Sequence, residues 1–259
     1  SEFIATSYKL EVGHPPGAPL FMMISRFFTM FAGPQHAALM VNAMSALASG
    51  ATIMFLFWSI THLARRAMRK RENELSMPQT IAVIGAGLVG SIAYTFTDTF
   101  WFSAVEGEVY ALSSFFTAIV FWAILKWENV ADEPHANRWL ILIAYLTGLA
   151  IGVHLLNLLI IPPIVLIYYF RKYSVTKWGV VKALLVSAAI LVAAMFIIIP
   201  GTIQLGALFD RLFVNTFGLP FNSGITVYAF ALFAALAWGV YLTHKKGKVL
   251  ANTILLCVT

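Results

Sequence analysis

The sequence predicts an all-α fold, a polytopic transmembrane helical bundle that crosses the bilayer about eight times. Of the 259 residues, 60% are hydrophobic and only 11% are charged, and the mean hydropathy is +0.84. Soluble globular domains are about half apolar and about a quarter charged, so this chain carries more apolar surface than one water-soluble core would hide. Its apolar runs approach the ~20 residues of a transmembrane helix and lack the alternation of barrel strands.

The long apolar runs give the predicted spans in chain order. Five runs qualify by length alone: Ala37–Leu63, Thr80–Thr97, Val109–Lys126, Gly179–Ile199 and Gly224–Thr243. The run Trp139–Phe170 is too long for one span. Because Gly152, His154 and Asn157 lie near its centre, we expect two short helices that meet there. The last span is expected to begin near Val249.

Basic residues between the runs predict which loops face the cytoplasm. The loops after the first, third, fifth and seventh spans hold thirteen Lys and Arg residues, whereas the opposite side holds only Lys9, Arg26 and Arg211. By the positive-inside rule, the basic loops are cytoplasmic, and the N-terminal segment, residues 98–108 and residues 200–223 face the outside. This topology explains the net charge of +6 without a nucleic-acid partner.

Small residues inside the spans predict close helix packing. Gly85, Gly87 and Gly90 match the dinucleotide fingerprint G-x-G-x-x-G. They lie in an unbroken apolar run, however, and not in the strand–turn–helix unit that a dinucleotide site requires. We therefore interpret them as helix-packing positions. The same interpretation applies to the pairs Ala46/Gly50, Gly87/Ser91 and Gly148/Gly152.

The first candidate site is the external N-terminal segment, residues 1–36. Residues 2–16 end in His14-Pro15-Pro16, where two prolines restrict the backbone. We interpret this stretch as a stiff loop that holds His14 and nearby carboxylates at the water–lipid boundary, and a plain structural turn is the alternative. Ala18–Phe31 is predicted to be a short helix that lies along the membrane interface.

The second candidate site is the acidic pair in Glu106-Gly107-Glu108, at the mouth of two spans. Oxygen ligands at this spacing suit a divalent cation, and one carboxylate could instead act as a general base. A solvated turn with ordinary charges is the alternative. Because carboxylates close to bilayer depth are costly, a functional role is the preferred hypothesis.

Two further positions are candidates for ligand binding. His154 and Asn157, between two short spans, could hydrogen-bond a ligand at the outer face, and hydrogen bonding between helices is the alternative for both. Arg211 is the external cation after the sixth span. It suits a phosphate group, or else a structural pair in the neighbourhood of Asp210.

The run from Glu2 to Phe21 resembles the start of a bacterial membrane family first catalogued as a domain of unknown function and now grouped with protein O-mannosyltransferase-like proteins. Ser103–Phe116 and Gly148–Pro162 resemble later motifs of that family, so the similarity covers nearly the whole chain. More distantly, the order of acid, His-Pro-Pro, interfacial helix and span resembles the GT-C superfamily of glycosyltransferases. The resemblance implies one transmembrane GT-C-like domain over residues 1–259.

The resemblance assigns roles to matching residues. Glu2 matches a first-loop Glu of the family, whose companion Asp three positions earlier would precede Ser1. Glu106 and Glu108 match the second acidic motif, which helps to bind metal or donor in several GT-C enzymes. We therefore expect Glu2, Glu106 and Glu108 to be catalytic, with a divalent cation on the last two. We expect substrate binding by Lys9, His14, Pro15, Pro16, Tyr110, His154, Asn157 and Arg211.

The resemblance also implies the reaction and the partners. We expect transfer of a hexose, mannose by the resemblance, from a polyprenyl-phosphate donor to Ser or Thr of a protein, with inversion. We expect the active face to point to the periplasm from a bacterial inner membrane. A GT-C enzyme acting on a glycan or a lipid is one alternative. A transporter or flippase without chemistry is another, although the external acids lie at span ends and no repeat is visible.

The ends of the sequence predict a longer parent protein. Ser1 opens the chain without an initiator Met, and Ile254–Thr259 closes it inside an apolar run. We expect a fragment that lacks the first span and the C-terminal part. We also expect this fragment to be inactive by itself, because the companion Asp lies outside it.

Overall fold

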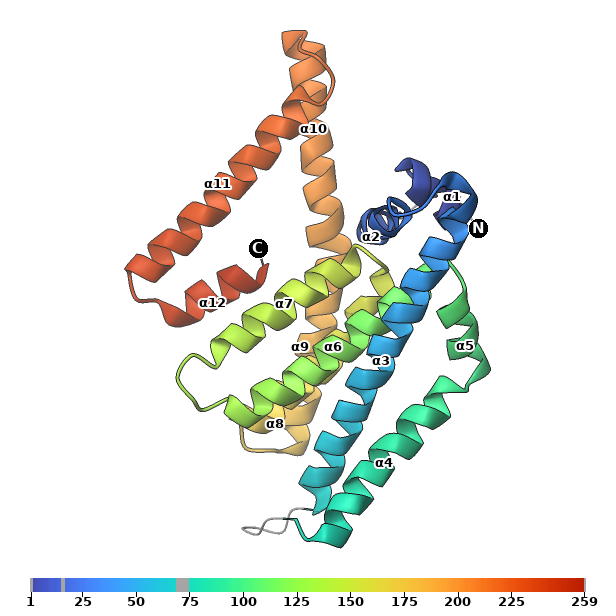
Figure 1. Cartoon of the computed structure of the whole chain (residues 1–259). Helices are drawn as coiled ribbons and strands as arrows, with labels where there is room; N and C mark the ends of the chain where they lie inside the picture. The colour runs from blue at the N-terminus through green and yellow to red at the C-terminus, as the bar shows by residue number, and fades with distance from the viewer. Residues whose placement is uncertain (1, 15–16, 69–74, 259) are drawn as a thin grey trace. The chain divides into compact units, whose positions relative to one another are not determined.

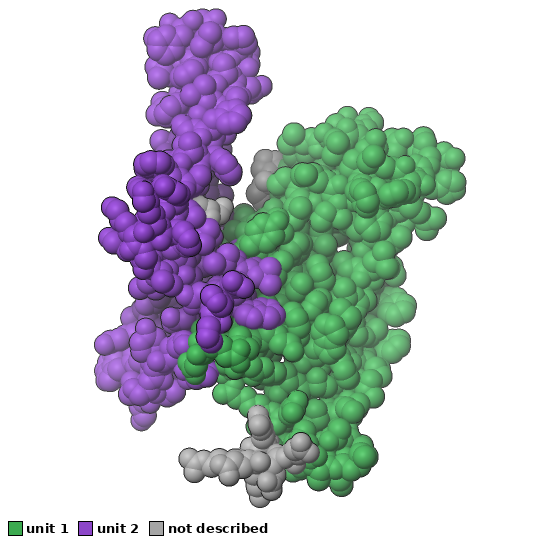
Figure 2. All heavy atoms as spheres, turned by 60° about the vertical axis from the view of Figure 1, so that its left-hand side comes forward, with its two compact units in different colours: residues 1–133, 145–160 green, residues 134–144, 161–259 purple. Residues whose placement is uncertain are grey.

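The computed structural model describes residues 2–14, 17–68 and 75–258. These residues form helices α1 to α12 with short 3-10 and π segments and no strand, which confirms the all-α prediction. Six of the described helical segments are long and apolar enough to cross a membrane, so the protein is an integral membrane protein. The chain divides into two compact units, residues 1–133 with 145–160 and residues 134–144 with 161–259 (Figure 2).

Unit 1 is built on three long helices, α3 (Ala37–Met68), α4 (Met77–Thr95) and α6 (Val109–Val130). All three were predicted as spans, and their observed ends differ from the prediction by a few residues. Helix α3 packs against both α4 and α6 along its length (Figure 1). Because the three helices alternate in direction, the end of α3, the start of α4 and the end of α6 share one end of the unit.

Two glycines of α4 face α3 at very short range. A Cβ atom on Gly87 would lie 2.5 Å from Cγ2 of Thr61, and one on Gly90 would lie 2.7 Å from Cδ1 of Ile60. No larger residue fits there without displacing α3. The G-x-G-x-x-G match is therefore a helix-packing surface, as predicted.

The other small-residue pairs differ from the prediction. Among the described residues, nothing lies within 4 Å of a Cβ atom built on Gly50 or Gly148, so the close approach expected at these two glycines is wrong. Gly152 does sit in a tight contact, but its neighbour is Leu20, and a Cβ atom there would lie 3.1 Å from Leu20 Cβ. Small residues predict that close packing is possible without saying which glycines use it.

The N-terminal segment contains two short helices, α1 (Glu2–Lys9) and α2 (Pro19–Thr29), which pack on each other. Helix α2 confirms the helix predicted over Ala18–Phe31. The prediction of a loop throughout residues 2–16 is wrong, because the first eight of these residues are helical. Burial against α2 explains the helix: Thr6 and Ser7 are buried on one side of α1, and a two-turn helix relies on such packing in water.

The segments on either side of α6 agree with the prediction in part. Residues 98–108, which were predicted to face the outside, are largely helical, because Asp98–Val105 forms helix α5. The break predicted near residue 154 is confirmed. Helix α7 (Asn137–Ile151) gives way to a 3-10 turn, η2 (Leu155–Ile160), before helix α8 (Ile161–Lys172) begins. Pro162 and Pro163 stand in the first turn of α8, where missing backbone N–H groups cost little.

Unit 2 contains an unusually long helical run. Helix α9 (Lys177–Ala193) continues through a π segment, η3 (Ala194–Ile198), into α10 (Ile199–Phe217), which makes 41 residues in all. At 1.5 Å per residue this is about 60 Å, about twice the hydrocarbon thickness of a bilayer. The prediction of a loop over residues 200–223 is therefore wrong for residues 200–217, which extend the helix.

The rest of unit 2 packs loosely within itself. Helix α10 ends at Gly218, whose φ of 65° is the left-handed conformation that favours glycine. Helices α11 (Ser223–Lys245) and α12 (Val249–Val258) follow, and α11 packs on α10 and α12. The most apolar stretch of α11 has no buried residue. Unit 2 therefore presents mostly apolar surface that suits lipid, and the residues that assemble a candidate site lie in unit 1.

Candidate active site

One buried core gathers the segments that carry the predicted acids of unit 1. It lies where α1 and α2 meet the starts of α3 and α6 and the residues that follow α7. We call this the acidic end of unit 1, after Glu2, Glu11, Glu106 and Glu108. The core residues include Phe21, Met22, Val41, Met44, Val109, Leu112, Ala150 and Val153. Four segments that are distant in the sequence are thus fixed to one another by apolar packing.

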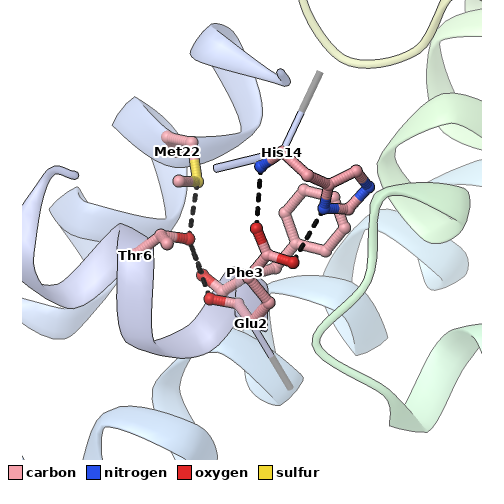
Figure 3. A network of polar contacts seen from close by, with 5 residues as sticks. All are labelled: Glu2, Phe3, Thr6, His14 and Met22. Atoms are coloured by element: carbon pink, nitrogen blue, oxygen red, sulfur yellow. Dashed lines mark hydrogen bonds and ion pairs between the residues drawn. The ribbon is translucent and has the colours of Figure 1, made fainter. Parts of the chain in front are cut away.

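Glu2 and His14 are joined by two hydrogen bonds (Figure 3). The backbone N–H of His14 donates to Glu2 Oε1 at 2.8 Å, and His14 Nδ1 lies 2.7 Å from Glu2 Oε2. The ring of Phe3 packs 5.9 Å from the His14 ring and 5.3 Å from the ring of Phe21, between ring centroids. Thr6 Oγ1 also contacts Met22 Sδ at 3.5 Å. Helix α1 therefore holds both His14 and α2 in place.

The hydrogen bonds from His14 lower the pKa of the Glu2 carboxyl below its usual value. The backbone N–H of His14 is the main cause, and the His14 side chain adds to it. Hydrogen bonds to a carboxylate favour its charged form. Glu2 is therefore ionised at neutral pH and accepts hydrogen bonds from His14. Its side chain keeps 47% of its surface exposed.

The acidic turn Glu106-Gly107-Glu108 joins α5 to α6 and packs against α1. Gly107 is buried, and a Cβ atom on it would lie 2.8 Å from Cγ1 of Ile4 and 3.0 Å from Oδ1 of Asn42. Ile4 is two residues after Glu2 on α1, so the acidic turn packs against the helix that bears Glu2, while residues two apart point to different sides of a helix. Glu106 is exposed and Glu108 half-buried, and neither side chain has a hydrogen bond or ion pair within the described chain.

Tyr110 and His154 lie together at the same end. Their ring centroids are 5.8 Å apart, and Tyr110 is exposed on the first turn of α6. The backbone N–H of Leu156 donates to His154 Nδ1 at 3.2 Å, so in the neutral ring the proton is on Nε2. Leu20 N–H donates to the Gly152 carbonyl at 2.9 Å, which ties this region to α2.

Asn157 uses its side chain inside the protein. Its Oδ1 accepts hydrogen bonds from Ser113 Oγ at 2.7 Å and Thr117 Oγ1 at 3.1 Å, and its Nδ2 donates to the Ala150 carbonyl at 2.8 Å. Only 3% of Asn157 is exposed. The geometry favours the alternative of hydrogen bonding between helices, while substrate binding by Asn157 stays a prediction.

Asp210 and Arg211 belong to unit 2 and lie on α10. Asp210 accepts hydrogen bonds from the backbone N–H groups of Asn222, Gly224 and Ile225, so it caps the start of α11. Arg211 is exposed. Within the described chain it has no ion pair, so the structural pairing considered for it is not observed. Its role at a phosphate stays a prediction.

The remaining predicted residues of the N-terminal segment have ordinary surface contacts. Lys9 Nζ lies 3.7 Å from Glu11 Oε1, and both side chains are well exposed. Arg26 donates to the Tyr8 carbonyl at 2.7 Å and stacks over the Tyr8 ring, which fastens the end of α1 to α2. The predicted substrate-binding residues Pro15 and Pro16 lie outside the described residues.

A comparison with known families decides what kind of protein carries this arrangement. A family model described as the protein O-mannosyl-transferase TMEM260 N-terminal domain matches residues 1–177. That is more than half of the 259 residues and includes both acidic motifs. The chain belongs to this family. No solved structure matches it.

Two residues at the acidic end of this O-mannosyl-transferase family member were not singled out by sequence reasoning. Gly107 is the contact point between the acidic turn and α1, and Asn42 lies beside it with a buried Oδ1 that no described residue hydrogen-bonds. Sequence reasoning could have singled out Asn42 because it is a polar amide in the first turns of an apolar span. Such a group is costly in the membrane unless it has a hydrogen-bonding partner. For Gly107 the signal was a glycine between two acids.

The acidic turn offers few protein ligands for a divalent cation. Among the described residues, no three His, Cys, Asp or Glu side chains come together in a group that could hold a metal ion. Glu106 and Glu108 provide two carboxylates, whereas Ca²⁺ takes about six to eight oxygen ligands. A resident Ca²⁺ would need further ligands, whereas Mg²⁺ is commonly held by one or two carboxylates together with substrate phosphates. A divalent cation on Glu106 and Glu108 therefore stays a prediction.

Proposed function

We propose that this protein is a glycosyltransferase of GT-C type that transfers mannose from a polyprenyl-phosphate donor to Ser or Thr hydroxyls of proteins. The observation that carries the proposal is the acidic end of unit 1. There, Glu106 and Glu108 have no described partner and pack through Gly107 against the helix that bears Glu2. Membership of the protein O-mannosyl-transferase family supports the sugar and the acceptor.

The proposed reaction is a single displacement with inversion at the anomeric carbon of mannose. The acceptor hydroxyl oxygen forms a bond to that carbon, and the bond from the same carbon to the donor phosphate oxygen breaks. The bonding electrons leave with the polyprenyl phosphate, and the hydroxyl proton passes to a carboxylate. Because the phosphate is already a good leaving group, the reaction requires a general base more than a general acid.

The three acids suit different parts of this reaction. Glu2 already accepts two hydrogen bonds from His14, so it holds His14 and the start of the α1–α2 connection in position. Glu106 and Glu108 have their oxygens free for an acceptor hydroxyl within the described chain. We therefore assign the proton acceptor to the Glu106/Glu108 pair and a positioning role to Glu2.

Cationic and N–H groups are needed on the other side of the breaking bond, where phosphate charge develops. Lys9, His14 and His154 are the candidates at the acidic end. His154 presents Nε2–H to a ligand in its neutral form, because Nδ1 is already occupied by the Leu156 N–H. Tyr110 packs beside His154 and offers an exposed aromatic face to a sugar ring.

The proposed location follows from the charges at the two ends of the spans. The basic loops face the cytoplasm under the positive-inside rule, so the acidic end faces the opposite side, the periplasm if the membrane is a bacterial inner membrane. A lipid-linked donor reaches such a site from within the outer leaflet. Both the donor and a secreted acceptor protein are thus available on one face.

The test is transfer of radiolabelled mannose from a polyprenyl-phosphate donor in membranes that contain the protein in its natural full length. Replacing both acids of the turn, Glu106→Ala with Glu108→Ala, should lower transfer by at least 10-fold, and loss of one transition-state contact commonly costs about 100-fold. Insertion and abundance should stay near wild type. Glu133→Ala is the matched control, because Glu133 is an exposed acid of unit 1 beyond the end of α6.

Acceptor choice is tested in the same assay with a Ser/Thr peptide, a glycan and a lipid as separate acceptors. Transfer to the peptide alone supports protein O-mannosylation. Transfer to the glycan or lipid instead would replace the acceptor while keeping the site. Near-wild-type transfer by the double variant would remove the acidic turn from the mechanism.

A further inference from the structure

A second cavity-bearing region lies at the opposite end of unit 1, where α3 and α6 end and α4 begins. We call it the basic end, after Arg65, Arg66 and Lys126, with Glu128 among them. Its cavity has a volume of about 790 Å³ and is lined by residues of all three helices. The residues used below are Trp58, His62, Arg65, Thr80, Trp122 and Lys126.

The charge of this cavity is positive. Arg65 and Lys126 both line it, and neither forms an ion pair with a described carboxylate. Glu128 is buried nearby, but Arg66 forms an ion pair with it, so that pair contributes little net charge. The two unpaired cations among the described lining residues favour an anionic ligand.

A polar atom in the lining has no partner in the described chain. His62 Nε2 is buried without a hydrogen bond, although the charges of Arg65, Lys126 and Glu128 act on this ring. Buried polar groups are nearly always hydrogen-bonded, and an exception calls for an explanation such as a bound ligand. This nitrogen does not open onto the cavity, so a ligand would reach it only after a rotation of the His62 ring.

The walls of the cavity are aromatic and lead toward the apolar part of the helices. The rings of Trp58 and Trp122 lie 5.8 Å apart, and Lys126 Nζ is 5.4 Å from the Trp122 ring centroid. Tryptophan is typical of the membrane–water interface. A separate cavity of about 510 Å³ lies on another face of α3, lined by Thr52, Leu56 and Ile60 of that helix and by residues of α4 and α6. It is lined largely by apolar atoms and small hydroxyl residues.

We propose that the cavity at the basic end binds the phosphate headgroup of an anionic membrane lipid. Two cations, Arg65 and Lys126, line the cavity and face the phosphate, and the two indole rings flank the apolar region beneath it. A free phosphate ion would use only the cations. The site is independent of sugar transfer at the acidic end.

The test measures lipid binding by the purified protein in detergent, using native mass spectrometry and titration with phosphatidylglycerol, phosphatidylcholine and inorganic phosphate. We expect retention of one phosphatidylglycerol in preference to phosphatidylcholine, and no displacement by inorganic phosphate at the same concentration. Arg65→Gln with Lys126→Gln should weaken phosphatidylglycerol binding by about 30-fold. Lys245→Gln with Lys246→Gln is the matched control, because it removes the same charge from unit 2 and should leave this binding unchanged.

A filling variant keeps the test decisive if the double variant fails to fold. Thr80→Trp retains every charge and occupies the cavity, so it should also abolish preferential retention of phosphatidylglycerol. Equal loss in the unit 2 control, equal retention of phosphatidylcholine, or displacement by inorganic phosphate at the lipid's own concentration would each overturn the proposal. Unchanged binding in Thr80→Trp would do so as well.

Discussion

The carboxylates at the two ends of unit 1 differ in burial and in pairing. At the basic end, Glu128 is 7% exposed and is neutralised by Arg66. At the acidic end, Glu106 and Glu108 remain at the surface without a described partner, while Glu2 accepts two hydrogen bonds from His14. A buried charge needs a partner to be tolerated, so Glu128 has a structural explanation. The exposed acids have none, which makes them the candidates for chemistry.

The largest effect in this comparison is expected from Glu2→Gln. The amide keeps the shape of the side chain and still accepts the backbone hydrogen bond from His14, but it removes the negative charge that holds the His14 ring. A hydrogen bond to a charged group contributes about 1.5–3 kcal/mol, so the displaced His14 should lower mannose transfer by about 10- to 100-fold. Glu11→Gln is the control, because Glu11 is exposed and pairs with Lys9. Equal effects of both substitutions would show that the contact between Glu2 and His14 has no special role.

A tenfold effect is expected from Gly107→Val, which alters the contact between the acidic turn and α1. The new side chain would overlap with Ile4 and Asn42, and such overpacking costs about 1–3 kcal/mol. The acidic turn and α1 should move apart, so transfer should fall while the acids themselves remain. Gly50→Val is the matched control, because Gly50 has open space beside it. Wild-type transfer by Gly107→Val would show that the acidic turn and α1 need not touch.

A smaller effect, a few-fold loss of transfer, is expected from His14→Ala. The substitution removes the side-chain hydrogen bond to Glu2 but keeps the backbone N–H, which is the main cause of the low pKa of Glu2. The pKa of Glu2 should therefore rise toward the usual value of a glutamate carboxyl. A carboxyl group whose pKa is lower in the folded protein than in the unfolded chain stabilises the fold above the unfolded-state pKa. That contribution is lost as the pH falls through the folded-state pKa. Because the folded-state pKa is higher in the variant, the contact between α1 and residue 14 should be lost at a higher pH. Carbon-13 NMR of the Glu2 carboxyl measures this shift, and an unchanged titration would contradict it.

Asn157→Ala should have the smallest effect on transfer and a clear effect on stability. It removes the hydrogen bonds to Ser113, Thr117 and the Ala150 carbonyl, and each such bond contributes about 0.5–1.5 kcal/mol. The thermal unfolding midpoint should fall, while transfer per folded molecule stays near wild type. A loss of transfer without a loss of stability would assign Asn157 to the substrate after all.

Long apolar runs were enough to predict most of the fold. Hydrophobic length alone located α3, α4, α6 and α11, and the break at residue 154 followed from the polar residues inside an overlong run. The errors came from segments whose structure depends on packing. Helix α1 is stabilised by α2, and α10 continues α9 beyond the length that a membrane requires, neither of which a local apolar pattern encodes.

The candidate site could be predicted as a set of residue types and not as an arrangement. Charge sign and position at span ends identified Glu2, Glu106 and Glu108. The packing of the acidic turn on the helix that bears Glu2 depends on Gly107 fitting against Ile4, and a sequence does not state which helix a glycine will face. Asn157 shows the reverse case, because a polar residue between spans can serve a neighbouring helix as well as a ligand.

The most direct measurement is donor protection of a single cysteine at each end of unit 1. Cys257→Ser removes the one cysteine of these 259 residues. Tyr110→Cys then places a single cysteine at the acidic end, and Glu133→Cys places one beyond the end of α6. With a membrane-impermeant maleimide, Tyr110→Cys should label from outside intact cells, and polyprenyl-phosphate mannose should slow that labelling. Glu133→Cys should label only after permeabilisation, with no effect of the donor. Labelling of both positions from the same side, or equal protection of both by the donor, would contradict a donor site at the acidic end.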